Sequence, residues 1–128
     1  MENKPLILVI DDQEAILYLL KQALEMYNYK ILIADNILNG LETYKNNLNE
    51  IDIVILDMQL GNIDYQISIP LLVKLNPEIK IFGMSGSVTL ADIPRKYRPN
   101  IVYFLEKPFS IEILLTELNK ILKSSIAL

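Results

Sequence analysis

Short, nearly unbroken apolar runs alternate along the chain with segments in which apolar residues recur at helical spacing. The unbroken runs predict strands that are buried on both faces; they cover residues 5–10, 29–34, 51–56, 79–84 and 101–105. The helical spacing predicts helices at about 13–27, 37–48, 64–75 and from 111 onward. Strands that alternate with helices predict an α/β fold, in which a parallel sheet lies between two layers of helices.

The segment 88–98 fits this alternation least well. A helix should follow the fourth strand here, but the segment contains Pro94 and is followed by Pro99, so we expect a short or irregular helix. Two polar residues mark the starts of other helices. We expect Asp12 at or next to the N-cap of the first helix, and Ser110 at the N-cap of the last.

The order of the strands decides which residues meet. Because crossovers are right-handed, few arrangements remain, and the chain fits the flavodoxin-like order 2-1-3-4-5. This is a (βα)5 three-layer sandwich, and we expect a single domain over residues 1–128. Polar residues follow four of the strands: Asp11 and Asp12, Asp57, Ser85, and Lys107. We expect these five side chains to meet at the carboxyl edge of the sheet, where open α/β sheets bind ligands.

Composition excludes several kinds of chemistry. The 128 residues include no cysteine and no histidine. Their absence removes disulfides, thiolate chemistry and the commonest general base, and it leaves oxygen as the ligand for any metal. A net charge of −4 argues against a nucleic-acid-binding surface. The sequence has no apolar span long enough to cross a membrane and no signal-peptide pattern, so we expect a cytoplasmic protein.

The acidic residues at the sheet edge suggest a specific chemistry. Carboxylates about 4 Å apart repel by about 4 kcal/mol per pair at an effective dielectric of about 20. A divalent cation relieves this repulsion, and Mg²⁺ prefers oxygen ligands. Asp57, being already ionised, can act as a nucleophile and form an aspartyl phosphate. Lys107 can neutralise phosphoryl oxygens, and the Ser85 hydroxyl can donate a hydrogen bond to one of them.

These residues, in this order at these strand ends, resemble the receiver domains of two-component response regulators, and the resemblance covers the whole chain. The matching residues are Asp11 and Asp12, Asp57, Ser85, and the run Lys107, Pro108 and Phe109. None of them is specific alone, but the four elements in this order make a strong signal.

The resemblance implies a role for each residue. Asp57 would be the phosphoacceptor, and Lys107 would pair with Asp57 or with its phosphate. Asp12 and Asp57 would bind Mg²⁺, while Asp11 would help through a bound water. The Gln59 main-chain carbonyl would be a further ligand of the cation. The peptide bond after Lys107 is typically cis in this family.

The resemblance also implies a switch and its partners. Ser85 would move toward the phosphate and the aromatic Phe104 would rotate inward, which changes the face formed by 88–98, strand 101–105 and the last helix. Phosphate drives this population shift only by binding one state better. The phosphoryl group would come from a sensor histidine kinase or a phosphotransfer protein, and the switched face would bind a downstream protein. A homodimer is a further candidate, because Ile113 lies beside this face. Neither nucleic acid nor a membrane is an expected partner.

Several positions depart from the family pattern or tune it. Gly61 stands where the family often has proline, and Tyr65 stands where glycine usually occurs. Glycine readily adopts positive φ, so Tyr65 predicts a reshaped loop after the phosphoacceptor. Gln59 and Ser87 occupy positions that tune the rate of autodephosphorylation in the family. Such a domain catalyses only this reaction and its own phosphotransfer.

Three other functions compete with this one. A pseudo-receiver that is never phosphorylated would act as an interaction module, but the intact acidic set argues against it. An aspartyl-phosphate phosphatase needs a second aspartate where this chain has Gln59. A flavodoxin needs a Ser/Thr/Gly-rich phosphate loop after the first strand, where Asp11 and Asp12 would repel phosphate. Because only 124–128 follow the last helix, we expect no output domain in this chain, unless it is a fragment of a longer regulator.

Overall fold

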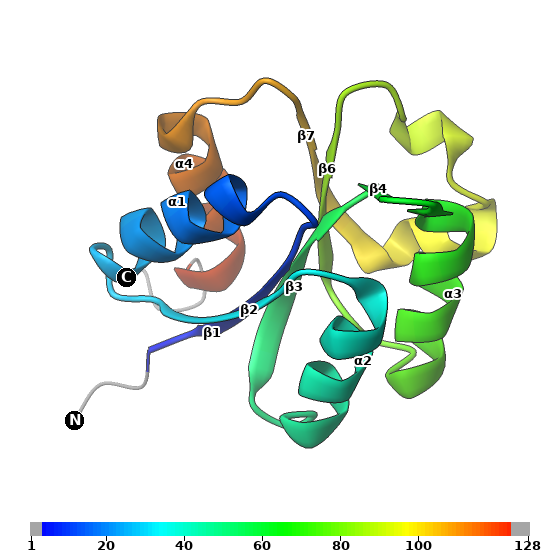
Figure 1. The fold of residues 1–128 in the computed structure, drawn as a ribbon, viewed down its shortest axis with the longest axis horizontal. Coiled ribbons are helices and arrows are strands. Elements are labelled where there is room, and N and C mark those ends of the chain that lie inside the picture. Colours follow the sequence, from blue (N-terminus) through cyan, green and yellow to red (C-terminus); the bar gives the residue numbers. More distant parts are fainter. Residues whose placement is uncertain (1–3, 124–128) are drawn as a thin grey trace.

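A five-stranded parallel sheet forms the centre of the molecule (Figure 1). The computed structural model describes residues 4–123. The strands are β1 (Leu6–Ile10), β2 (Lys30–Ala34), β3 (Ile51–Asp57), β6 (Ile81–Ser85) and β7 (Ile101–Glu106). Their order is β2-β1-β3-β6-β7, which confirms the predicted flavodoxin-like arrangement.

Helices cover both faces of this sheet. They are α1 (Glu14–Glu25), α2 (Ile37–Asn46), α3 (Tyr65–Leu75) and α4 (Ile111–Lys123). Helices α1 and α4 lie on one face, and α2 and α3 lie on the other (Figure 1). Successive side chains of a strand point to opposite faces, so Ile7 and Val9 join the core under α1 and α4, whereas Leu8 and Ile10 join the core under α2 and α3.

The segment between β6 and β7 contains no α-helix. It forms two short 3₁₀ helices, η1 (Leu90–Asp92) and η2 (Arg95–Asn100), as the prediction of a short or irregular helix required. Pro94 and Pro99 each lack the N–H that an α-helix needs. The Arg98 side chain joins the two turns by donating hydrogen bonds to the carbonyl oxygens of Ile93 and Ala91, at 2.8 and 3.0 Å.

A small hairpin follows β3 and was not expected. Its strands, β4 (Gln59–Leu60) and β5 (Ile63–Asp64), are antiparallel and have two residues each. The turn between them contains Gly61, whose φ of +63° lies in the left-handed region that glycine adopts without strain. Asp64 then caps α3, because its side chain accepts a hydrogen bond from the Gln66 N–H. The hairpin therefore leads the chain directly from the end of β3 into the next helix.

Two predicted helix caps have different outcomes. The Ser110 hydroxyl accepts hydrogen bonds from the N–H groups of Glu112 and Ile113, which confirms it as a cap of α4. At the start of α1 the N-cap residue is Gln13, which makes no side-chain capping bond. Asp12 lies next to the N-cap, as expected, but its carboxylate does not cap the helix and accepts a hydrogen bond from the Gly61 N–H.

Candidate functional site

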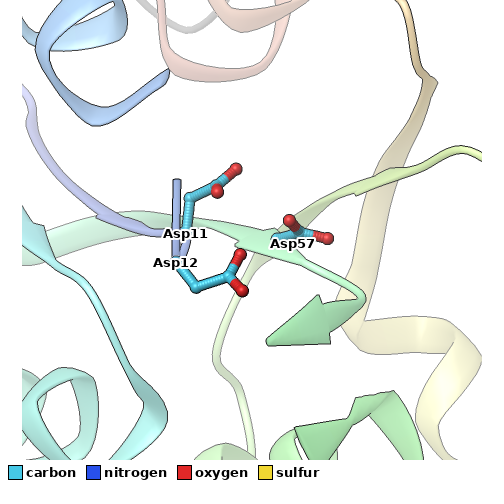
Figure 2. Close-up of side chains that lie close together, drawn as sticks. All are labelled: Asp11, Asp12 and Asp57. Atoms are coloured by element: carbon cyan, nitrogen blue, oxygen red, sulfur yellow. The ribbon is translucent and has the colours of Figure 1, made fainter. Parts of the chain in front are cut away.

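Three carboxylates gather at the carboxyl ends of β1 and β3 (Figure 2). Asp11 and Asp12 follow the last residue of β1, and Asp57 is the last residue of β3. One oxygen from each carboxylate lies within 4.8 Å of the others. Asp11 is 0% exposed and Asp57 is 6% exposed, whereas Asp12 is exposed to solvent. The register explains the meeting, because β1 and β3 are hydrogen-bonded neighbours that end together, with Ile10 opposite Leu56.

Lys107 supplies the positive charge of this cluster. Its Nζ lies 2.9 Å from Asp57 Oδ2 and 3.4 Å from Asp11 Oδ2. The residue follows β7, and its N–H donates to the Ser85 carbonyl oxygen at 2.8 Å, which fixes the backbone beside the end of β6. The peptide bond between Lys107 and Pro108 is cis, as expected.

Burial and charge shift the protonation equilibria of two of these groups. Burial raises the pKa of Asp11, and the negative charge of Asp57 adds to this, while hydrogen bonding to the Gln13 N–H and the charge of Lys107 oppose it. For Lys107, burial alone would lower the pKa. The hydrogen bond to Asp57 and the charges of Asp11 and Asp57 outweigh burial and raise the pKa, so the ammonium form is retained.

Asp12 is held by the backbone of the hairpin. Its Oδ2 accepts a hydrogen bond from the Gly61 N–H at 3.0 Å, across 49 residues of chain. The sequence could not indicate this bond, because it depends on a turn that brings Gly61 back toward β1. The only available signal was a glycine in the loop that follows Asp57.

The hairpin also contacts Asp57 and closes on itself. The Gln59 N–H donates to Asp57 Oδ1 at 3.0 Å, and the Gln59 side chain donates to the Gly61 carbonyl oxygen at 2.7 Å. The reshaping of this loop by Tyr65 stays a prediction. Tyr65 begins α3, and the positive φ of the turn is adopted by Gly61 instead. The role of the Gln59 carbonyl as a metal ligand stays a prediction.

The roles predicted for Ser85 and Phe104 stay predictions. Ser85 is buried at the end of β6, and its hydroxyl oxygen accepts hydrogen bonds from the N–H groups of Ser87 and Val88, at 3.0 and 2.7 Å. Phe104, on β7, is partly buried against the core under α2 and α3. It pairs with Gly83 of β6, where a Cβ would lie 3.5 Å from the Phe104 ring.

The carboxylates suit a small, hard cation. Mg²⁺ takes oxygen ligands at about 2.0–2.1 Å in octahedral geometry, so its most distant ligand pair is about 4.2 Å apart. Oxygens that already lie within 4.8 Å of one another need to close in only slightly. The one ammonium group of Lys107 pairs with Asp11 and Asp57 but not with Asp12, so bound Mg²⁺ would also relieve the remaining repulsion among the three carboxylates. The acidic cluster could therefore hold a metal.

Comparison with known proteins defines the class of this protein. A family model for the response regulator receiver domain matches residues 7–119, and the chain belongs to this family. Receiver domains are signalling domains of two-component systems rather than classical enzymes, and they interact with histidine kinases and downstream effectors. Membership of this family replaces the phosphatase and flavodoxin interpretations.

Individual relatives agree with this class. The chain is 29% identical over 119 residues to the nisin biosynthesis regulatory protein NisR of Lactococcus lactis subsp. lactis, covering 91% of this chain and 50% of that protein. It thus spans about half the length of this curated relative. A response regulator receiver domain protein from Clostridium thermocellum matches with a TM-score of 0.82 and 26% identity, covering 94% of this chain and 96% of that chain.

A further solved structure carries a modified residue. It is a response regulator protein from Burkholderia pseudomallei with a phosphorylated aspartic acid, calcium ion and citrate. The match has a TM-score of 0.74 and 25% identity, and covers 97% of this chain and 74% of that chain.

In the present protein, none of the helices among residues 4–123 is long and apolar enough to cross a membrane. The expected cytoplasmic location stays a prediction.

Proposed function

We propose that this receiver domain accepts a phosphoryl group on Asp57 from a phosphohistidine of a sensor kinase or phosphotransfer protein. The observation that carries the proposal is the position of the Asp57 carboxylate. It lies at the carboxyl edge of the sheet, 2.9 Å from the Lys107 ammonium group and beside the carboxylates of Asp11 and Asp12. The phosphorylated aspartic acid in the Burkholderia relative supports the same chemistry.

The transfer needs no general base, because an ionised carboxylate is already a nucleophile. An oxygen of Asp57 forms a bond to phosphorus while the bond from phosphorus to the donor's imidazole nitrogen breaks, and the electron pair leaves with the imidazole. Lys107 neutralises charge on the phosphoryl oxygens and holds Asp57 in place through its hydrogen bond. Ser85 Oγ accepts two backbone N–H bonds, so its own O–H can be donated to a phosphoryl oxygen.

The proposed cofactor is Mg²⁺. Asp12 and Asp57 would hold it directly, together with the Gln59 main-chain carbonyl, and Asp11 would hold it through a water molecule. When bound, the cation neutralises negative charge on the carboxylates and the phosphoryl group. The calcium ion that accompanies the Burkholderia relative supports a divalent cation in this class of protein.

The proposed output is a change in binding at one face of the molecule. Movement of Ser85 and rotation of Phe104 would shift the population of conformations of η1, η2, β7 and α4, and so change the affinity for a downstream protein. A second copy of the chain is another candidate partner, because Ile113 on α4 is 48% exposed.

Phosphorylation can be tested with a small phosphoryl donor. The protein is incubated with acetyl phosphate and MgCl₂ and then weighed intact by mass spectrometry. We expect a single phosphoryl adduct on the wild type and none on Asp57→Asn, which keeps the shape of the side chain. The control Asp35→Asn removes an exposed carboxylate outside the cluster and should be phosphorylated normally. The proposal fails if the wild type gains no adduct, or if Asp57→Asn still gains one.

A further inference from the structure

The contact between Asp12 and Gly61 lies at the edge of the acidic cluster and joins two segments far apart in sequence. We propose that the Gly61 N–H positions the Asp12 carboxylate for cation binding, so that the β4–β5 hairpin is part of the apparatus that sets Mg²⁺ affinity. This inference rests on the proposed function, because it concerns the cation that the function requires. Gly61 acts through Asp12 and is therefore a positioning residue.

Asp12 needs such a partner because its two acidic neighbours already have one. Asp11 and Asp57 share the ammonium group of Lys107, and both are buried. Asp12 is exposed, and its carboxylate lies within 4.8 Å of theirs. Repulsion from the other two carboxylates and the pull of solvent both favour rotation of Asp12 away from them. A hydrogen bond from an N–H to a carboxylate is strengthened by the charge, and it opposes this rotation.

The bond leaves Asp12 free to bind a cation. The Gly61 N–H uses a lone pair of Oδ2, and a carboxylate has about four such acceptor sites on its two oxygens. Asp12 can therefore keep this hydrogen bond while it binds Mg²⁺. The N–H restricts rotation of the Asp12 side chain before the cation binds, so less conformational freedom is lost on binding. Outer partners of metal ligands usually contribute to a metal site in this way.

The hairpin holds the Gly61 N–H in place from two directions. The Gln59 side chain donates to the Gly61 carbonyl oxygen at 2.7 Å, and the Gln59 N–H donates to Asp57 Oδ1 at 3.0 Å. The same short hairpin thus contacts two of the three acids. Its turn depends on the φ of +63° at Gly61. A Cβ there would be 3.9 Å from Asp12 Oδ2, so conformation and the N–H matter at this position rather than space.

Replacement of Gly61 tests the N–H together with the turn that presents it. Gly61→Pro removes the donor and also the left-handed turn, because proline fixes φ at about −65°. Gly61→Asn keeps the donor and tolerates the left-handed conformation. MgCl₂ is titrated into each unphosphorylated protein, and binding is followed by ¹H–¹⁵N NMR and by calorimetry. We expect Gly61→Pro to bind Mg²⁺ about 10-fold more weakly than the wild type, as the loss of an outer partner commonly does. Gly61→Asn should lose less, and the control Asp35→Asn should bind as the wild type does.

Two further variants keep the test decisive. In an Asp12→Ala background, Gly61→Pro should weaken binding no further, because the side chain that accepts the N–H has been removed. If Gly61→Pro does not fold, Gln59→Leu replaces it, since this change releases the Gly61 carbonyl and leaves the backbone intact. It should speed hydrogen exchange at the Gly61 amide and weaken Mg²⁺ binding.

The outcomes distinguish this inference from the proposed function. A wild type that binds no Mg²⁺ overturns both. The positioning role of Gly61 is overturned if the wild type binds Mg²⁺ and is phosphorylated, while Gly61→Pro or its substitute Gln59→Leu binds Mg²⁺ as tightly as the wild type does. The proposed function then stays in place.

Discussion

Asp57 and Asp12 belong to one acidic cluster, but the protein holds them in different ways. The buried half of the cluster consists of Asp11, Asp57 and Lys107, in which opposite charges meet at 2.9 and 3.4 Å. In the exposed half, Asp12 is held by a backbone N–H of the hairpin, 3.0 Å away. The comparison teaches that the position of the proposed nucleophile depends on folding of the whole sheet, whereas that of the exposed carboxylate of Asp12 depends on one turn.

Removal of the Lys107 ammonium group should have the largest effect on stability. Lys107→Met leaves two buried carboxylates without their ammonium partner, and we expect the free energy of unfolding to fall by about 3 kcal/mol in urea denaturation with EDTA present. MgCl₂ should restore part of this stability, because a cation that binds only the folded cluster stabilises it.

The control for Lys107 is Lys120→Met. Lys120 is exposed, and its Nζ lies 3.4 Å from Glu117 on the surface of α4, where an ion pair contributes little. Equal losses in the two variants, or a Lys107→Met protein that Mg²⁺ does not stabilise, would show that the buried half is not held by charge.

A smaller loss of stability should follow from crowding at Met58, next to Asp57. In Gly83→Ala the new Cβ would lie 2.7 Å from Cε of Met58, the residue after Asp57, so either Met58 or the strand must move. We expect a loss of about 2 kcal/mol, which is typical of overpacking in a core. Combination with Met58→Ala should recover part of the loss, which a double-mutant cycle in urea measures.

Gly86→Ala is the matched control for this crowding. A Cβ at Gly86 would meet nothing within 4 Å, so the change should leave the free energy of unfolding nearly unaltered. If Gly83→Ala is equally harmless, or if the double variant loses the full sum of both single losses, the packing of Met58 over Gly83 does not support the buried half.

The exposed half should show the opposite balance between stability and binding. Asp12→Asn should change the free energy of unfolding by only about 0.5 kcal/mol, because the side chain is exposed. Its Mg²⁺ affinity should nevertheless fall strongly, since a charged ligand is lost. Urea denaturation and Mg²⁺ titration of the same samples measure the two effects. A large loss of stability without a loss of affinity would contradict the division into two halves.

The sequence predicted the buried half well, and the physical reason is the regularity of the sheet. Apolar runs located the five strands, and parallel strands place their carboxyl ends at one edge, so Asp11, Asp57 and Lys107 had to approach one another. Pro94 and Pro99 were likewise enough to predict an irregular segment before β7. Each of these predictions used a pattern that extends over many residues.

The place of Asp12 in the cluster was expected, but the hairpin that holds it escaped prediction because it depends on short-range geometry. Strands of two residues, such as β4 and β5, have no hydrophobic period that a sequence could display. Asp12 lies next to the N-cap of α1, as expected, but its side chain accepts the Gly61 N–H and not one from the helix. An aspartate can accept an N–H from any nearby segment, and only the folded turn decides which one it meets.

The strand order also determines when each charge joins the others during synthesis. The ribosome delivers β1, β2 and β3 first, and these three strands are direct neighbours in the sheet, so all three acids belong to the first 57 residues. Lys107 follows 50 residues after Asp57, and it reaches the cluster only once β7 has added to the far edge beyond β6. A nascent chain that ends after β6 would carry the complete set of acids without the lysine. Completion of the last strand therefore brings the cluster its positive charge at the same time as it completes the sheet.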